Sequence, residues 1–74
     1  MRETWDEHLA WCKARALEYL DAGDLGQAVA SMMSDLTKWN GGARKVDLNL
    51  GMIGILLARN QDAEGVRLWI EVFQ

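Results

Sequence analysis

The 74-residue sequence has little of several residue types on which small proteins often depend. It has one cysteine, so no disulfide can form within the chain, and the cross-linked frameworks of small secreted domains are excluded. One histidine beside one cysteine is too few for a complete zinc site of the usual Cys/His type. Proline is absent, and a composition that is 26% charged and 50% apolar excludes collagen, a flexible linker and a charge-rich disordered tail.

Long apolar runs are missing as well. The longest stretch, 52–58, is far too short to cross a membrane, and the acidic start of the chain lacks the apolar segment of a signal peptide. The formal net charge of -3 argues against nucleic acid as a partner. We therefore expect a small acidic cytosolic protein with a single domain over 1–74, and without a membrane or nucleic-acid partner.

The first half of the chain carries clear helix signals. Thr4 and Glu7 have the spacing of a capping box, which predicts a helix over 5–22 that ends before Gly23. The next residues, Asp24 to Gln27, have the same spacing and predict a second helix that ends near residue 39. Because the turn between the helices is so short, they must form an antiparallel hairpin over about 5–39.

The second half predicts another pair of helices. Asn40-Gly41-Gly42 stops the second helix and begins a loop to about residue 45. The third helix is expected over 46–59 and the fourth over 63–73, with Asp62 as its N-cap. No segment alternates with the period of a strand. The predicted fold is all-α, with four short helices in two antiparallel hairpins, the second over about 46–73.

Spacing around each helix identifies the face that is buried. The first two helices each have one apolar stripe, so they can cover one another, and the far side of the second helix is predicted to be solvated. That solvated side carries Gln27, Ser31, Ser34 and Lys38. The stripes consist of Trp5, Leu9, Cys12, Ala16, Tyr19 and Leu20 in the first helix, and Leu25, Ala28, Val29, Met32, Leu36 and Trp39 in the second. The fourth helix has a wide apolar sector with Val66, Trp69, Ile70 and Phe73 plus Leu68 and Val72.

The third helix is apolar nearly all round. One stripe contains Val46, Leu50, Ile53 and Leu57, and a second, on the other side, contains Leu48, Met52, Ile55 and Leu56. Four short helices have too little surface to cover both stripes, and a domain of this size is marginally stable. We therefore expect the second stripe to face a partner, most simply a second copy in a homodimer.

Two further features bear on that interface. Trp11 lies opposite the core stripe of its helix and is a candidate partner contact, the alternative being that Arg15 or the fourth helix covers it. Between the two stripes of the third helix, Gly51, Gly54 and Ala58 let another backbone come close. We favour a tight crossing with a neighbouring helix there, over a dimer seam or a ligand groove.

The sequence offers few residues that could serve in catalysis or bind a metal ion. His8 and Cys12 lie one helical turn apart, and a dimer could in principle bring two such pairs around zinc. We favour the simpler interpretation, with Cys12 in the core and His8 at its edge. Arg44 and Lys45 are too few to hold a phosphate, and no Ser–His–Asp set is available. The protein is expected to be no enzyme and to need no cofactor or metal.

Two resemblances add to this reading. Tyr19, Gly23-Asp24, Leu25 and Ala28 resemble the centre of a tetratricopeptide repeat over one hairpin only, which makes a solenoid unexpected. More specifically, Trp11-Cys12-Lys13, 15–20, Gly23-Asp24, 28–36, Leu50-Gly51-Met52 and 70–73 resemble a family of short proteins encoded by tailed bacteriophages and prophages, although Lys38-Trp39-Asn40 departs from its Lys-His-Pro type ending.

That second resemblance implies a phage gene product in the bacterial cytoplasm, and no particular activity. We expect a non-enzymatic accessory protein that acts by protein–protein contact and binds itself and a host protein. A structural or assembly component of the virion is the first alternative, and a metal-dependent regulator using His8 and Cys12 is the second.

Overall fold

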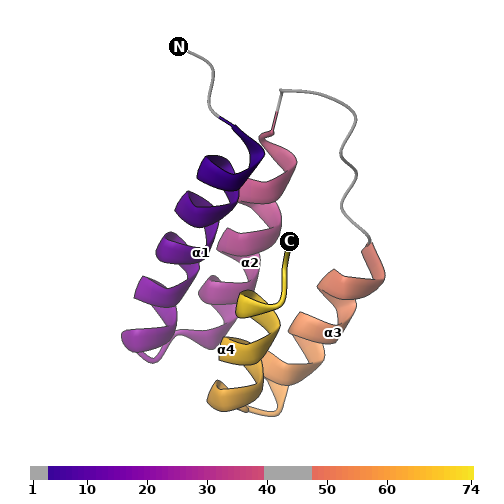
Figure 1. The fold of residues 1–74 in the computed structure, drawn as a ribbon. Helices are drawn as coiled ribbons and strands as arrows, with labels where there is room; N and C mark the ends of the chain where they lie inside the picture. Colours follow the sequence, from indigo (N-terminus) through magenta and orange to yellow (C-terminus); the bar gives the residue numbers. More distant parts are fainter. Residues whose placement is uncertain (1–3, 40–47) are drawn as a thin grey trace.

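The structure is a computed structural model that describes residues 4–39 and 48–74, with the side chain of Leu48 excepted. The predicted all-α fold is confirmed, and its helices form two hairpins (Figure 1). The predicted loop over 40–45, the helix start at Val46 and the basic pair Arg44 and Lys45 lie outside the described residues. The helices are α1 (Trp5–Asp21), α2 (Leu25–Thr37), α3 (Leu48–Arg59) and α4 (Ala63–Glu71).

Local hydrogen bonds explain where the helices begin and end. The Thr4 hydroxyl accepts a hydrogen bond from the Glu7 backbone N–H at 3.1 Å, and the Glu7 carboxylate accepts one from the Thr4 N–H at 2.9 Å. Asp24 caps α2 in the same way, because its carboxylate accepts from the Gln27 N–H at 3.1 Å. Gly23 has a φ of 83°, the left-handed conformation that turns the chain between α1 and α2.

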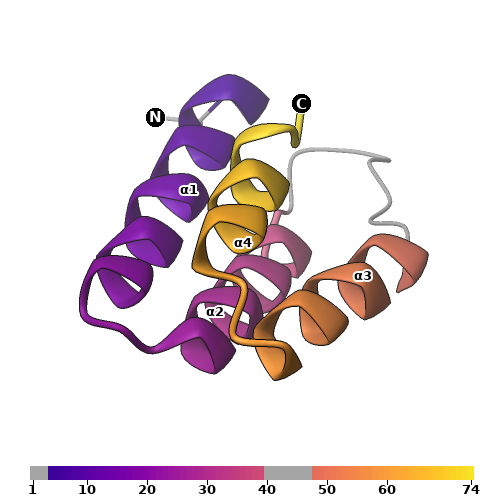
Figure 2. The same ribbon diagram turned by 90° about the horizontal axis from the view of Figure 1, so that it is seen from below.

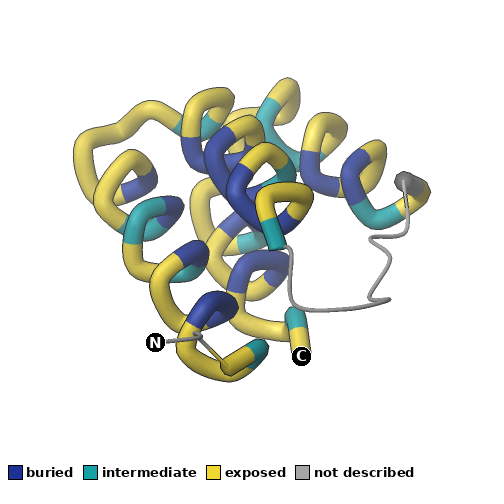
Figure 3. Tube along the Cα trace, turned by 90° about the horizontal axis from the view of Figure 1, so that it is seen from above, coloured by how far each residue is buried: buried dark blue, intermediate teal, exposed yellow. Residues whose placement is uncertain are grey.

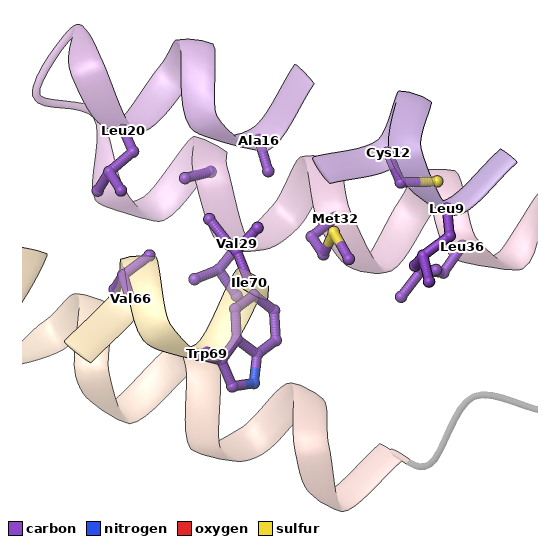
Figure 4. Packing of buried hydrophobic residues seen from close by; sticks show 11 residues of the cluster. Leu9, Cys12, Ala16, Leu20, Val29, Met32, Leu36, Val66, Trp69 and Ile70 are labelled. Carbon is purple, nitrogen blue, oxygen red and sulfur yellow. The ribbon is translucent and has the colours of Figure 1, made fainter. Parts of the chain in front are cut away.

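The core lies where α1, α2 and α4 meet. Met32 of α2 and Ile70 of α4 are its largest fully buried apolar side chains, and Cys12 of α1 is fully buried beside them. Figure 4 shows Val29, Val66 and Ile70 converging between α2 and α4. Within the described ranges, α3 contacts α2 and α4 but not α1, so it lies at the edge of the bundle (Figure 2).

α3 packs through its smallest residues. A Cβ atom at Gly54 would lie 2.6 Å from Cζ2 of Trp69, and one at Gly51 would lie 2.9 Å from Cε of Met33. The Trp69 indole N–H also donates to the Leu50 carbonyl at 2.8 Å, so this ring lies directly against the α3 backbone. The small residues therefore face the bundle, and beside them Met52, Ile53, Ile55 and Leu56 are exposed.

Three sequence predictions about burial are wrong. Ile53 is 49% exposed, because the side of α3 with Gly51 and Gly54 faces the bundle and turns Ile53 away from it. Tyr19 is 37% exposed, since it lies at the margin of its stripe in the last turn of α1. Ser31 is buried rather than solvated, and its hydroxyl donates to the Asp35 carboxylate at 3.3 Å.

Candidate functional site

One side of the α3–α4 hairpin carries a group of exposed aliphatic side chains, which we call the outer face. It consists of Ile53 and Leu56 on α3 and Leu68 and Val72 on α4, with exposed fractions of 49%, 55%, 61% and 65%. Met52, one turn before Leu56, extends this face and is 62% exposed. In Figure 3 the tubes of α1, α2 and α4 turn their buried residues toward one another, whereas most of α3 is exposed.

Helix geometry places the members of the outer face next to one another. A Cβ atom added at Gly65 of α4 would lie 2.9 Å from Cδ2 of Leu57 of α3, so these two residues lie close together. Ile53 precedes Leu57 by four residues, so it lies on the same side of α3, toward α4. Leu68 follows Gly65 by three residues and lies on the side of α4 that faces α3. The outer face is therefore continuous across both helices.

A groove lies between α2 and α3, on the other side of α3. It has a volume of about 380 Å³ and is lined by Gly26, Val29, Ala30, Met33, Ile55, Ala58 and Arg59. Ile55 is 53% exposed, and Arg59 is the one charged residue of the lining. Because Ile53 and Ile55 are two positions apart, they point about 160° away from each other around the helix. The groove thus opens away from Ile53, while its wall Ile55 follows Met52 by three residues and adjoins it on α3.

His8 and Cys12 both lie in the interior of the hairpin. Cys12 is fully buried, and His8, predicted at the edge of the core, is only 4% exposed because the rings of Trp5 and Trp39 lie over it at centroid distances of 6.2 and 5.4 Å. Nε2 of His8 lies 2.8 Å from the carbonyl oxygen of Asp35, which can only accept, so this nitrogen carries the proton. Over 4–39 and 48–74, no three His, Cys, Asp or Glu side chains are grouped as metal ligands.

An ionic network around the buried carboxylate of Asp35 was not predicted from the sequence. Its carboxylate is 2.7 Å from Nε of Arg15 on α1 and 3.3 Å from Nζ of Lys38, in addition to the hydroxyl of Ser31. Burial raises the pKa of Asp35, but hydrogen bonds from Arg15 and Lys38 outweigh burial and hold it below the ordinary value of 3.8. The hydrogen bond with Asp35 also raises the pKa of Arg15.

Part of this network was visible in the sequence. Ser31, Asp35 and Lys38 follow a spacing of four and three residues, so they share one side of α2. That spacing does not show that Arg15 of the other helix reaches the same carboxylate. The network joins α1 to α2, with the Asp35 carboxylate buried and the side chains of Arg15 and Lys38 reaching it from the surface.

The structure separates Trp11 from the other predicted interface residues. Trp11 is 44% exposed on α1, and the guanidinium carbon of Arg15 lies 5.0 Å from its ring centroid, so it is both exposed and stacked by Arg15. Met52, Ile55 and Leu56 lie on α3, whose described part makes no contact with α1. The side chain of Leu48 lies outside the described residues.

No protein-family model, curated protein or solved structure matches this chain. None of the helices α1 to α4 is long and apolar enough to cross a bilayer. The evidence for function therefore consists of the outer face, the groove and the sequence resemblance.

Proposed function

We propose that this protein is a small non-enzymatic phage accessory protein that acts by protein–protein contact and pairs with a second copy through the outer face. The observation that carries the proposal is the exposure of Ile53, Leu56, Leu68 and Val72 together on one side of a hairpin. Single exposed apolar residues are normal on protein surfaces, whereas contiguous apolar patches mark interaction sites.

The chemistry of α3 supports association. Residues 48–58 contain no charged side chain, although the chain as a whole is 26% charged. Interface centres are depleted in charge, and a two-fold dimer needs only one self-complementary patch. Apposed outer faces would meet this condition along α3.

The available surface supports a second copy as the partner. The chain exposes 5135 Å² in total, and a standard interface takes about 800 Å² from each partner. An interface of this size would include the outer face, Met52 and the polar residues around them on two adjoining helices. A small domain also buries too little surface on its own, so dimer formation adds to its stability.

The phage origin and the bacterial cytoplasm as its location rest on the sequence resemblance at Trp11-Cys12-Lys13, Gly23-Asp24 and the segments near them. In this setting a host protein is a further partner. Trp11 is the candidate contact for it, because this ring lies on α1, away from the outer face.

Sedimentation equilibrium at micromolar concentration tests the proposed dimer. We expect about twice the monomer mass of 8.3 kDa for the natural chain. The double variant Ile53→Glu, Leu68→Glu should sediment as a monomer that keeps its helical circular dichroism, since both side chains are exposed. Ala10→Glu, an exposed position on α1, is the matched control and should remain a dimer. A natural chain of monomer mass would contradict the proposal.

A further inference from the structure

We propose that the groove between α2 and α3 binds a medium-chain fatty acid, with the alkyl chain along the groove and the carboxylate at Arg59. The groove opens on the side of α3 away from Ile53, and this inference does not rest on the proposed dimer. It assigns a small-molecule ligand to the protein in addition to a protein partner.

The size and lining of the groove suit an alkyl chain. Its volume of about 380 Å³ lies within the range of small-ligand pockets, about 300–1,000 Å³. Val29, Met33 and Ile55 provide apolar walls, and the flexible thioether of Met33 can adapt to an occupant. An alkyl chain would shield these walls from water.

Gly26 has no packing reason of its own within the chain. Glycine inside a helix costs about 1 kcal/mol relative to alanine. At Gly51, Gly54 and Gly65 a Cβ would come within 3 Å of another side chain, which explains those glycines. At Gly26 a Cβ would meet only Asp24 Oδ1, 4.0 Å away, among the described residues. Gly26 lines the groove, and the space beside it is open.

Arg59 determines the expected headgroup. It is the one cation of the lining, and it forms no ion pair or hydrogen bond with any side chain in 4–39 or 48–74. The two other arginines in the described ranges are paired, Arg15 with Asp35 and Arg67 with Asp21. A guanidinium binds a carboxylate through two parallel hydrogen bonds, so a single anionic headgroup fits beside Arg59.

Titration with decanoate, below the concentration at which it forms micelles, tests the site. Methyl NMR should show shifts at Met33 and Ile55, with the core methyl groups of Met32 and Ile70 unchanged. Decanol should bind about tenfold more weakly, because it lacks the charge-assisted hydrogen bond to Arg59. Decyltrimethylammonium should bind least, since its headgroup has the same sign as Arg59.

Two variants separate the roles of space and charge. Gly26→Leu should abolish decanoate binding by filling the groove, and it should remain folded because the position is exposed and leucine favours helix. Arg59→Gln should weaken decanoate about tenfold and leave decanol unchanged. Ala10→Leu and Arg67→Gln are matched controls on other surfaces and should bind like the natural chain.

Three results would overturn the inference. Equal affinity of Arg59→Gln and the natural chain for decanoate would show that Arg59 does not bind the carboxylate. Equal affinity for all three amphiphiles would indicate nonspecific contact with apolar surface. If Gly26→Leu sediments as a monomer, the occupant of the groove is a second copy of the chain and not a fatty acid. If Gly26→Leu remains a dimer and fails to bind decanoate, the proposed dimer through the outer face is unaffected.

Discussion

The two hairpins of this protein differ in which side chains they bury. In α1–α2, large apolar residues such as Leu9, Met32 and Leu36 pack against one another, and a buried ionic network joins the helices. In α3–α4, contact is made by glycines against Trp69 and Met33, while large aliphatic side chains remain exposed. The difference shows that the most apolar helix of a small bundle need not be the most buried one. The large apolar side chains of the first hairpin are covered by each other and by α4, whereas α3 and α4 leave large aliphatic side chains exposed.

Truncating one methionine in each region should give the largest contrast. Met32→Ala leaves a cavity at a fully buried position, so the free energy of unfolding should fall by about 2–5 kcal/mol. Met52→Ala removes a side chain that is 62% exposed, and the change should stay within about 0.5 kcal/mol. Urea denaturation followed by circular dichroism, at a concentration that keeps the chain monomeric, measures both. Equal losses would contradict the contrast between the hairpins.

A methyl group added to each of two helical glycines should have opposite effects. Gly54→Ala forces Trp69 to move and weakens its hydrogen bond to Leu50, so stability should fall by about 1–3 kcal/mol. Gly26→Ala meets open space and should raise stability by up to about 1 kcal/mol through helix propensity. Thermal unfolding gives the two signs, and the NMR signal of the Trp69 indole N–H reports the lost bond. A stabilised Gly54→Ala would show that α3 does not pack closely on α4.

The smallest expected effect concerns pH and the network of the first hairpin. The pKa of Asp35 is depressed in the folded chain, so its stabilising contribution is present above the unfolded value and is lost as pH falls through the lower folded pKa. Asp35→Asn should cost about 1–2 kcal/mol near neutral pH and should flatten the acid limb of the stability curve. Denaturant titrations across the acid range measure this slope.

Asp21→Asn is the matched control for that measurement. Asp21 is 68% exposed and pairs with Arg67 at 2.9 Å on the surface, so removing its charge should change stability by less than about 1 kcal/mol. If Asp35→Asn kept the acid slope of the natural chain, the Asp35 carboxylate would not be the group whose protonation destabilises the fold.

Prediction from the sequence succeeded where the signal was local. The capping box at Thr4 and the left-handed turn at Gly23 involve residues within four positions of each other, and both occur as expected. Prediction failed at Ile53 and Ser31, because the side of a helix that faces inward depends on its neighbours. The exposure of Met52 and Leu56 could be predicted, because one helix carries more apolar residues than its neighbours can cover. The groove beside Gly26 was not predicted.

The sequence by itself therefore determined the four helices of the described ranges, the ends of α1 and α2 and the surplus of apolar side chains in α3, because these depend on backbone hydrogen bonds and on periodicity along the chain. Only the tertiary structure decided how α3 is rotated, which carboxylate is buried, and that Arg59 lines a groove while Trp11 lies on a separate surface. The physical reason is that a close contact such as Trp69 on Gly54 is made between residues far apart in the chain, and it fixes which side of each helix remains exposed.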